Sequence, residues 1–193
     1  MPKGTKGSAR VRLLDAAEEM LREVGMAGTG IKDVVARSGA PIGSLYHYFP
    51  DGKTQLVSES LRIHAEKSRR LLEHFFDGRQ TAAAAVSLLF NTAADAFERA
   101  GAYKGCAVGA VALDLMPRDT ALREICRSTF DEWAAVIAPR LPFSSERARH
   151  ASAVTVVAAL EGAFVLAKAA KSGDPFRDVG ECLAATMSSR RGR

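Results

Sequence analysis

The stretch GAPIGSLYHYFPDGK, residues 39–53, decides the fold of the amino-terminal part of this chain. It opens on a glycine, closes on Pro-Asp-Gly, and carries the ring side chains Tyr46, His47, Tyr48 and Phe49 between them. The run before it, residues 31–38, places its apolar side chains on one helical face. Two short helices joined by a tight glycine-containing turn are the layout of a helix-turn-helix. We therefore predict that the second helix, residues 42–49 with Pro41 at its first position, faces DNA.

The ring side chains of this second helix divide by direction. Leu45 and Phe49 are four residues apart, so both can face the core of a small helical bundle. A helix this short cannot bury rings on every side, which leaves Tyr46, His47 and Tyr48 for solvent or for a partner. Tyrosine hydroxyls and imidazole N–H groups donate well to phosphate oxygens, while the small residues Gly43 and Ser44 permit close approach to base edges.

Lys53 gives a separate indication. A lysine in the first turn of a helix opposes the helix dipole, unless an anion binds there and shares the free N–H groups. A DNA phosphate would be such an anion. The alternative is an ordinary surface lysine that tolerates a weak penalty.

The composition is that of a globular protein: 193 residues, of which 47% are hydrophobic and 25% charged. The net charge of +5 and the pI near 9.3 suit a nucleic-acid partner without requiring one. Three widely spaced cysteines and no apolar leader predict a reduced, cytoplasmic protein. The longest apolar stretch, residues 151–167, is rich in Ala and Gly and contains Glu161, so no membrane span is predicted.

Hydrophobic residues recur at three- and four-residue steps along nearly the whole chain, and no segment alternates with a period of two. The predicted fold class is all-α, with about nine helices. Glycine, proline and capping signals delimit the helices, which are expected at residues 8–24, 31–38 and 42–49, at 51–76 with Asp51 as its cap, and within 78–101, 104–117, 119–139, 144–174 and 175–189. We expect a helix-turn-helix domain at residues 1–55 and a second helical domain at residues 56–193.

The strings LLDAAEEMLREVG and TGIKDVVARSGAPIGSLYHYFPDGKTQLV resemble the DNA-binding domain of the tetracycline repressor (TetR) family of one-component transcription regulators. The later string GCAVGAVALD is also similar to the LmrA/YxaF-type branch of that family, whose members tend to repress export or resistance genes. The resemblance implies that Thr29 and Lys53 contact phosphates and that the second helix touches backbone and bases. The DNA-binding residues predicted in this way are Thr29, Ile42, Gly43, Ser44, Tyr46, His47, Tyr48 and Lys53.

Three positions depart from the family pattern. Ile42 stands where a polar or basic residue is usual, so its contact would be apolar, for example to a thymine methyl group. Val35 replaces a small alanine at the helix crossing. The FPDGK sequence is one residue longer than the common FPSK form, which affects the placement of Lys53.

The resemblance also implies that the second domain binds a ligand and forms a homodimer through its last two long helices. Small residues on the first of these helices would allow close helix approach: Ala151, Ala158, Ala159, Gly162 and Ala163. An Ala-rich hydrophobic helix can equally be an ordinary core helix, and the residues alone leave both interpretations open.

A small, largely apolar effector is the expected ligand. The side chains that could line its pocket are Phe90, Phe97, Leu113, Asp114, Met116, Phe130, Trp133, Glu161 and Phe164, although large apolar residues at helical spacing are usually core. Asp114 and Glu161 stand alone among apolar neighbours, and a carboxylate in that position needs a partner. Each can pair with an arginine or lysine at a helix rim, or contact a polar group of the ligand.

The predicted function is a DNA-binding transcriptional regulator, in the form of a repressor that a small molecule releases from its double-stranded operator. An enzyme is the rival, but the four histidines show no metal-binding spacing and no nucleophile or nucleotide-binding motif is present. We therefore predict no catalytic site, metal or cofactor. A helical small-molecule-binding protein without DNA binding is the other alternative, and it leaves Lys53 and the exposed tyrosines unexplained.

Overall fold

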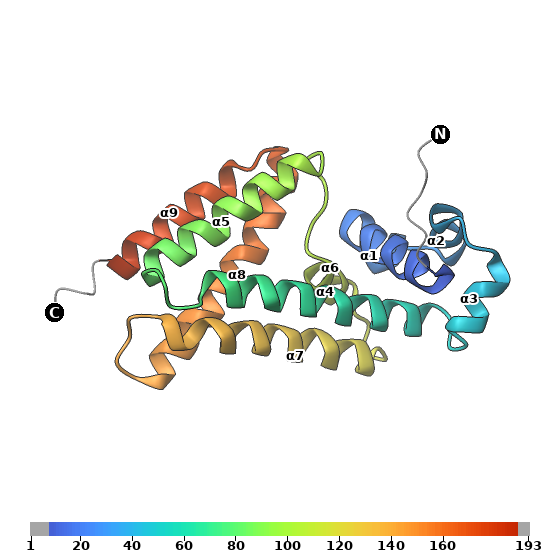
Figure 1. Cartoon of the computed structure of the whole chain (residues 1–193), viewed down its shortest axis with the longest axis horizontal. Coiled ribbons are helices and arrows are strands. Elements are labelled where there is room, and N and C mark those ends of the chain that lie inside the picture. Colours follow the sequence, from blue (N-terminus) through green and yellow to red (C-terminus); the bar gives the residue numbers. More distant parts are fainter. Residues whose placement is uncertain (1–7, 189–193) are drawn as a thin grey trace. The chain divides into compact units, whose positions relative to one another are not determined.

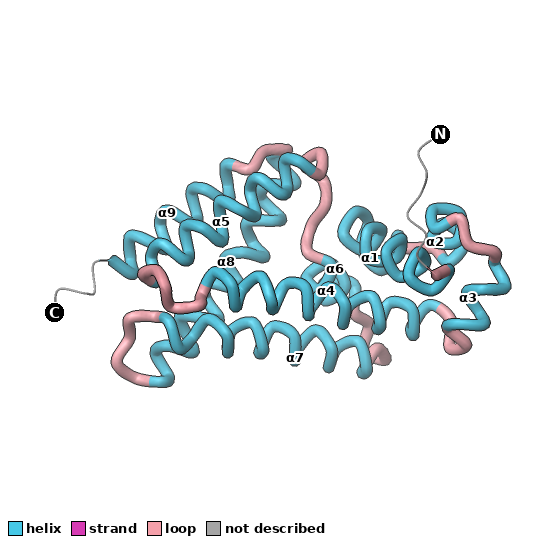
Figure 2. The backbone as a smooth tube through the Cα atoms, viewed as in Figure 1, coloured by secondary structure: helices cyan, strands magenta, loops and turns pink. Residues whose placement is uncertain are grey.

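The structure is a computed structural model that describes residues 8–188, so the outermost parts of the two predicted domains, residues 1–7 and 189–193, lie outside the described residues. The described part of the chain is all-α, as predicted, and nearly every segment is helical (Figure 2). Its nine α-helices and one 3₁₀-helix are α1 (Ala9–Gly28), α2 (Ile31–Ser38), α3 (Ile42–Tyr48), α4 (Lys53–Phe75), α5 (Ala82–Arg99), α6 (Ala107–Asp114), α7 (Thr120–Ile137), η1 (Ala138–Arg140), α8 (Glu146–Ala170) and α9 (Asp174–Ser188).

The described residues form two compact units. The first, here called the reading unit, comprises residues 8–64 and 107–126, and the second, the helical unit, comprises residues 65–106 and 127–188. The boundary between the units falls inside α4, after residue 64, and inside α7, after residue 126. The helix α6 belongs to the reading unit, although residues 65–106 before it belong to the helical unit.

The reading unit is built around α1, which packs against α2, α3 and α6 (Figure 1). Apolar residues at helical spacing give α1 one buried face, and they meet apolar residues from the other helices of the unit. This core contains Leu13, Leu14, Ala16, Ala17, Met20, Val34, Ala40, Leu45, Phe49 and Leu56. The helix-turn-helix therefore has a hydrophobic core of its own.

Three helix ends differ in detail from the sequence prediction. The regular part of α1 stops at Gly25, as predicted, where φ is 70°, a backbone conformation that favours glycine, but one further helical turn then follows to Gly28. Pro41 is the N-cap of α3 rather than its first residue. The helix α4 begins at Lys53 rather than being capped by Asp51, because Gly52 with φ 65° lies between them.

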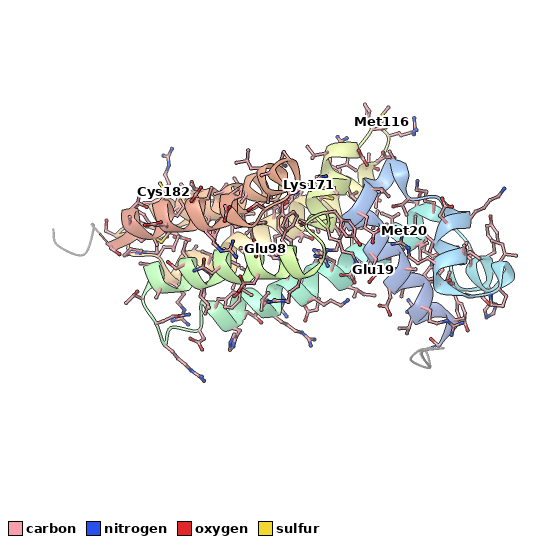
Figure 3. All side chains as sticks on the ribbon, turned by 90° about the horizontal axis from the view of Figure 1, so that it is seen from above. Glu19, Met20, Glu98, Met116, Lys171 and Cys182 are labelled. Carbon is pink, nitrogen blue, oxygen red and sulfur yellow. The ribbon has the colours of Figure 1, made fainter. Side chains whose placement is uncertain are left out.

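In the helical unit α5 and α9 lie side by side and run antiparallel (Figure 1). Ion pairs join the end of α5 to the start of α9: Arg177 lies 3.1 Å from Asp95 and 3.0 Å from Glu98, which is labelled in Figure 3. The hydrogen bonds from Arg177 and from the Gly173 N–H hold the pKa of Glu98 down to about 2. Halfway along, Gly180 of α9 leaves no space for a Cβ against Phe90 of α5.

The helix α8 is long and apolar enough, by length and composition, to meet the criteria for a membrane span, which the sequence prediction had excluded. Only 28% of its most apolar window is buried within the chain. Val154, Val165 and Leu166 are among its exposed side chains. An apolar strip of α8 is therefore uncovered in the isolated chain.

Candidate nucleic-acid interface

The outer face of α3 is exposed. Tyr46 and Ile42 keep 55% and 51% of their surface open to solvent, and Gly43 and His47 are exposed beside them. Nothing lies within 4 Å of the position a Cβ would take on Gly43, so the backbone is open to approach on this face. Ser44 and Tyr48, also predicted to contact DNA, are half-buried.

The inner face of α3 anchors it to the reading unit. Leu45 and Phe49 are fully buried in the core, as predicted from their four-residue spacing. The Tyr48 ring packs partly against that core and meets the His47 ring edge-on, with 4.8 Å between centroids. Tyr48 therefore supports the helix, and Tyr46 and His47 are the rings that α3 turns outward.

The turn before α3 is tied down by side chains. Gly39 has φ 62°, a left-handed conformation that closes α2 without the strain a side chain would bring. The Ser38 hydroxyl donates to the Val35 carbonyl and accepts from the Ala40 N–H. From α1, the Arg12 guanidinium donates to the Ser38 carbonyl at 3.0 Å. These bonds set the angle at which α3 leaves α2.

Lys53 lies at the start of α4 and is half-buried. Its ammonium donates to the Met26 carbonyl at 2.7 Å, in the last turn of α1. An ammonium has three N–H donors, so this bond leaves two for an anion. The structure thus shows which protein group orients Lys53, which the sequence did not indicate.

Thr29 is only 1% exposed, and its hydroxyl donates to the Gly25 carbonyl at 2.6 Å. It closes the broken end of α1. The Thr29 side chain is therefore buried and hydrogen-bonded at the end of α1, and its phosphate contact stays a prediction.

The nine residues predicted to line an effector pocket divide between the two units. Leu113, Asp114 and Met116 belong to the reading unit, where Leu113 is 81% exposed and Met116 projects from the loop after α6 (Figure 3). The other six belong to the helical unit: Phe90, Phe97, Phe130, Trp133, Glu161 and Phe164. A single pocket within one unit cannot include all nine.

Three aromatic rings gather in the helical unit. Phe176 of α9 lies 5.8 Å from Phe97 and 4.8 Å from Phe164, centroid to centroid, and is fully buried. Phe176 is not among the predicted pocket residues, although its position one residue after Pro175 places it in the first turn of a helix whose start the sequence predicts. Phe130 and Trp133 form a separate edge-on pair, and the Trp133 indole donates to the Ala65 carbonyl.

The two isolated carboxylates find partners other than the predicted arginines or lysines. Asp114 accepts the Ala27 N–H at 2.9 Å. Glu161 accepts a hydrogen bond from the Cys106 thiol. Burial raises the pKa of Glu161 to about 7, and the bond from Cys106 offsets part of that rise.

Residues 13–59 match the family described as bacterial regulatory proteins, tetR family, and residues 82–182 match the C-terminal domain of LmrA/YxaF-like transcriptional regulators. The chain belongs to the TetR family. Its resemblance to the LmrA/YxaF-type branch is confirmed by the same matches, and it is a DNA-binding transcriptional regulator.

The HTH-type transcriptional regulator LmrA of Bacillus subtilis is 31% identical to this TetR-family chain over 180 residues, which cover 92% of this chain and 95% of LmrA. A TetR regulatory protein from Rhodobacter sphaeroides has the same fold, with a TM-score of 0.82 at 24% identity over 93% of this chain and 98% of that one. CifR, solved with 26-bp double-strand operator DNA, superposes with a TM-score of 0.80 at 19% identity over 97% and 99%. The relatives are transcriptional regulators rather than enzymes.

Proposed function

We propose that this regulator is a cytoplasmic repressor that binds a double-stranded operator as a homodimer and leaves it when a small, largely apolar effector binds. Residues 1–55 read the DNA, and residues 56–193 bind the effector and form the dimer, although residues 56–64 and 107–126 of this second segment pack within the reading unit. The observation that carries the proposal is the division of α3, whose Leu45 and Phe49 are buried while Tyr46, His47, Ile42 and Gly43 face solvent.

The accessible residues of α3 can each make a contact in a DNA groove. The Tyr46 hydroxyl and the His47 imidazole can donate to phosphates or base edges, and Ser44 adds a hydroxyl beside them. Ile42 offers an apolar contact to a thymine methyl group, and Gly43 lets the backbone approach closely. Lys53 adds a charged phosphate contact at the start of the following helix.

A second copy of the chain is the partner we propose for the uncovered strip of α8. Val154, Val165 and Leu166 are exposed along it, and so are the small residues Ala151, Ala158 and Gly162. Small residues let two helices approach closely, and large ones bury apolar area when they do. Ala163, predicted to belong to the same contact, is instead buried within its own chain.

Dimerisation also has a functional reason. One short recognition helix reads only a few base pairs, so two must sit about one DNA turn apart to reach useful affinity. The effector would favour a dimer in which that spacing is wrong, and a ligand can shift the equilibrium only by its differential affinity for the two states.

Within the helical unit, Phe130, Glu161 and Phe164 are the predicted ligand residues that keep part of their surface accessible. Phe90, Phe97 and Trp133 are buried and serve as core around them. We propose that the effector contacts the accessible three, with an apolar body against the rings and a hydrogen-bond donor toward Glu161.

Selection of bound duplexes from fragmented genomic DNA, followed by titration of the best duplex at several salt concentrations, tests the proposed function. We expect nanomolar-range binding to the selected duplex, much weaker binding to scrambled DNA, and an affinity that falls as salt rises. If the purified protein bound no duplex at low salt, the repressor would be excluded in favour of a helical small-molecule-binding protein.

A further inference from the structure

One peptide group in the reading unit is bound at both of its polar atoms. The Ala27 N–H donates to Asp114 Oδ2 at 2.9 Å, and the Met26 carbonyl accepts from Lys53 Nζ at 2.7 Å. These two atoms belong to the same peptide bond, which is planar and rigid. Asp114, the last residue of α6, and Lys53, the first residue of α4, are therefore linked through a single rigid unit.

The interruption of α1 at Gly25 leaves this peptide group free to form hydrogen bonds with groups outside the helix. Gly25 adopts φ 70° and ψ −175°, which ends the regular hydrogen bonding of α1 one turn before Gly28. A Cβ on Gly25 would lie 2.7 Å from Asp114 Oδ2, so the carboxylate approaches this closely only because the residue is glycine. The Thr29 hydroxyl holds the Gly25 carbonyl and closes the turn.

The two bonds reinforce each other electrostatically. Each is assisted by a charge, negative at the N–H and positive at the C=O, so both polarise the amide in the same direction. Loss of the carboxylate would leave the Ala27 N–H without this acceptor and would loosen the Met26 carbonyl, which then keeps only the longer bond from the Thr29 N–H, at 3.3 Å, besides its bond from Lys53.

We propose that Asp114 is a positioning residue for operator binding, because it fixes the Met26 carbonyl that aims the Lys53 ammonium at a DNA phosphate. This inference rests on the proposed function, in which Lys53 contacts the operator. Lys53 is half-buried, and its bond to Met26 leaves two N–H donors for a phosphate. The Met26 carbonyl therefore orients the Lys53 ammonium and still leaves N–H donors free to bind a phosphate.

A double-mutant cycle tests whether Asp114 acts through Lys53. The four proteins are the full-length wild type, Asp114→Ala, Lys53→Met and the double variant, and the readout is the dissociation constant for the selected duplex by fluorescence anisotropy. We expect each single change to weaken binding roughly tenfold and the double variant to bind no more weakly than Lys53→Met alone. Both single variants should also lower the slope of log affinity against log salt, by about one for each phosphate that the protein no longer neutralises.

Asp114→Asn serves as the conservative variant, because its amide oxygen can still accept from Ala27, and it should recover most of the affinity. A cooperative thermal unfolding transition, measured for each variant, serves as the control that the variant is folded. Additive effects of Asp114→Ala and Lys53→Met, or wild-type affinity and salt slope in Asp114→Ala, would overturn the inference alone. Failure of the wild type to bind any duplex would instead overturn the proposed function, and this inference with it.

Discussion

Asp114 and Lys53 bind the two polar atoms of a single peptide group, the one that joins Met26 to Ala27. Asp114 was expected to meet a ligand or a basic side chain, and Lys53 was expected to bind a phosphate. In the structure each is already engaged with the end of α1. The helix-turn-helix is therefore positioned in part by α6, a helix that follows it only after α4 and α5 along the chain.

Replacing Gly25 with alanine should destabilise the protein. The backbone at Gly25, with φ 70° and ψ −175°, lies in a region that side chains rarely adopt, and the new Cβ would collide with the Asp114 carboxylate. We expect a loss of about 1–3 kcal/mol in the free energy of unfolding, measured by urea denaturation. An unchanged midpoint would show that α6 can withdraw from α1 without consequence.

Replacing Gly43 with alanine should have the opposite effect on stability. Gly43 lies within α3 and has no atom within 4 Å of its Cβ position, so alanine should stabilise the helix by roughly 0.5–1 kcal/mol. Operator binding should nevertheless fall, because the methyl group would stand between the helix and the base edges. A variant that is both more stable and equally able to bind DNA would remove Gly43 from the interface.

Tyr46→Ala should weaken operator binding at least tenfold without changing the dimer or the unfolding temperature, because the ring is exposed and supports no core residue. Tyr46→Phe separates the hydroxyl from the ring. Tyr103→Ala is the matched control, since Tyr103 is also an exposed tyrosine but belongs to the helical unit. Equal losses from Tyr46→Ala and Tyr103→Ala would indicate a general effect rather than a DNA contact.

Leu166→Arg should convert the proposed dimer into a monomer, because it places a charge in the apolar strip of α8. Size-exclusion chromatography with light scattering gives the mass directly. Leu88→Arg changes another exposed leucine, on α5, and should leave the dimer intact. The monomer should also lose most of its operator affinity, since a single half-site remains. A dimeric Leu166→Arg variant would place the subunit contact elsewhere.

Glu161 should make stability depend on pH between about 4.5 and 7. Burial raises its pKa in the folded chain to about 7, from 4.5, so the folded state holds a proton that the unfolded state has lost. The free energy of unfolding should therefore fall as pH rises through this window, by up to about 1.4 kcal/mol per pH unit from this group.

Glu161→Gln has no titrating group at this position, so the difference between its unfolding curves and those of the wild type isolates the contribution of Glu161. Cys106→Ala removes the thiol donor that favours the carboxylate and should raise the pKa of Glu161 further. Identical pH profiles for the wild type and Glu161→Gln would mean that Glu161 is solvated in the folded protein.

The sequence by itself determined the helices and the division of α3. The hydrophobic period and the positions of glycine and proline suffice for this, because Leu45 and Phe49 lie four residues apart on one helical face and Gly39 permits the left-handed turn before them. These are local properties, set by the backbone and by neighbours within one or two turns. The family assignment follows from the same short strings.

Only the tertiary structure decided which groups meet across the chain. Ala27 and Asp114 are 87 residues apart, and no periodicity relates them. The burial of Thr29, with its hydroxyl on the Gly25 carbonyl, and the contacts of Phe176 with Phe97 and Phe164 also depend on how the helices pack. From the sequence one can predict that a carboxylate or an aromatic ring among apolar residues needs a partner. The identity of the partner depends on how the helices pack.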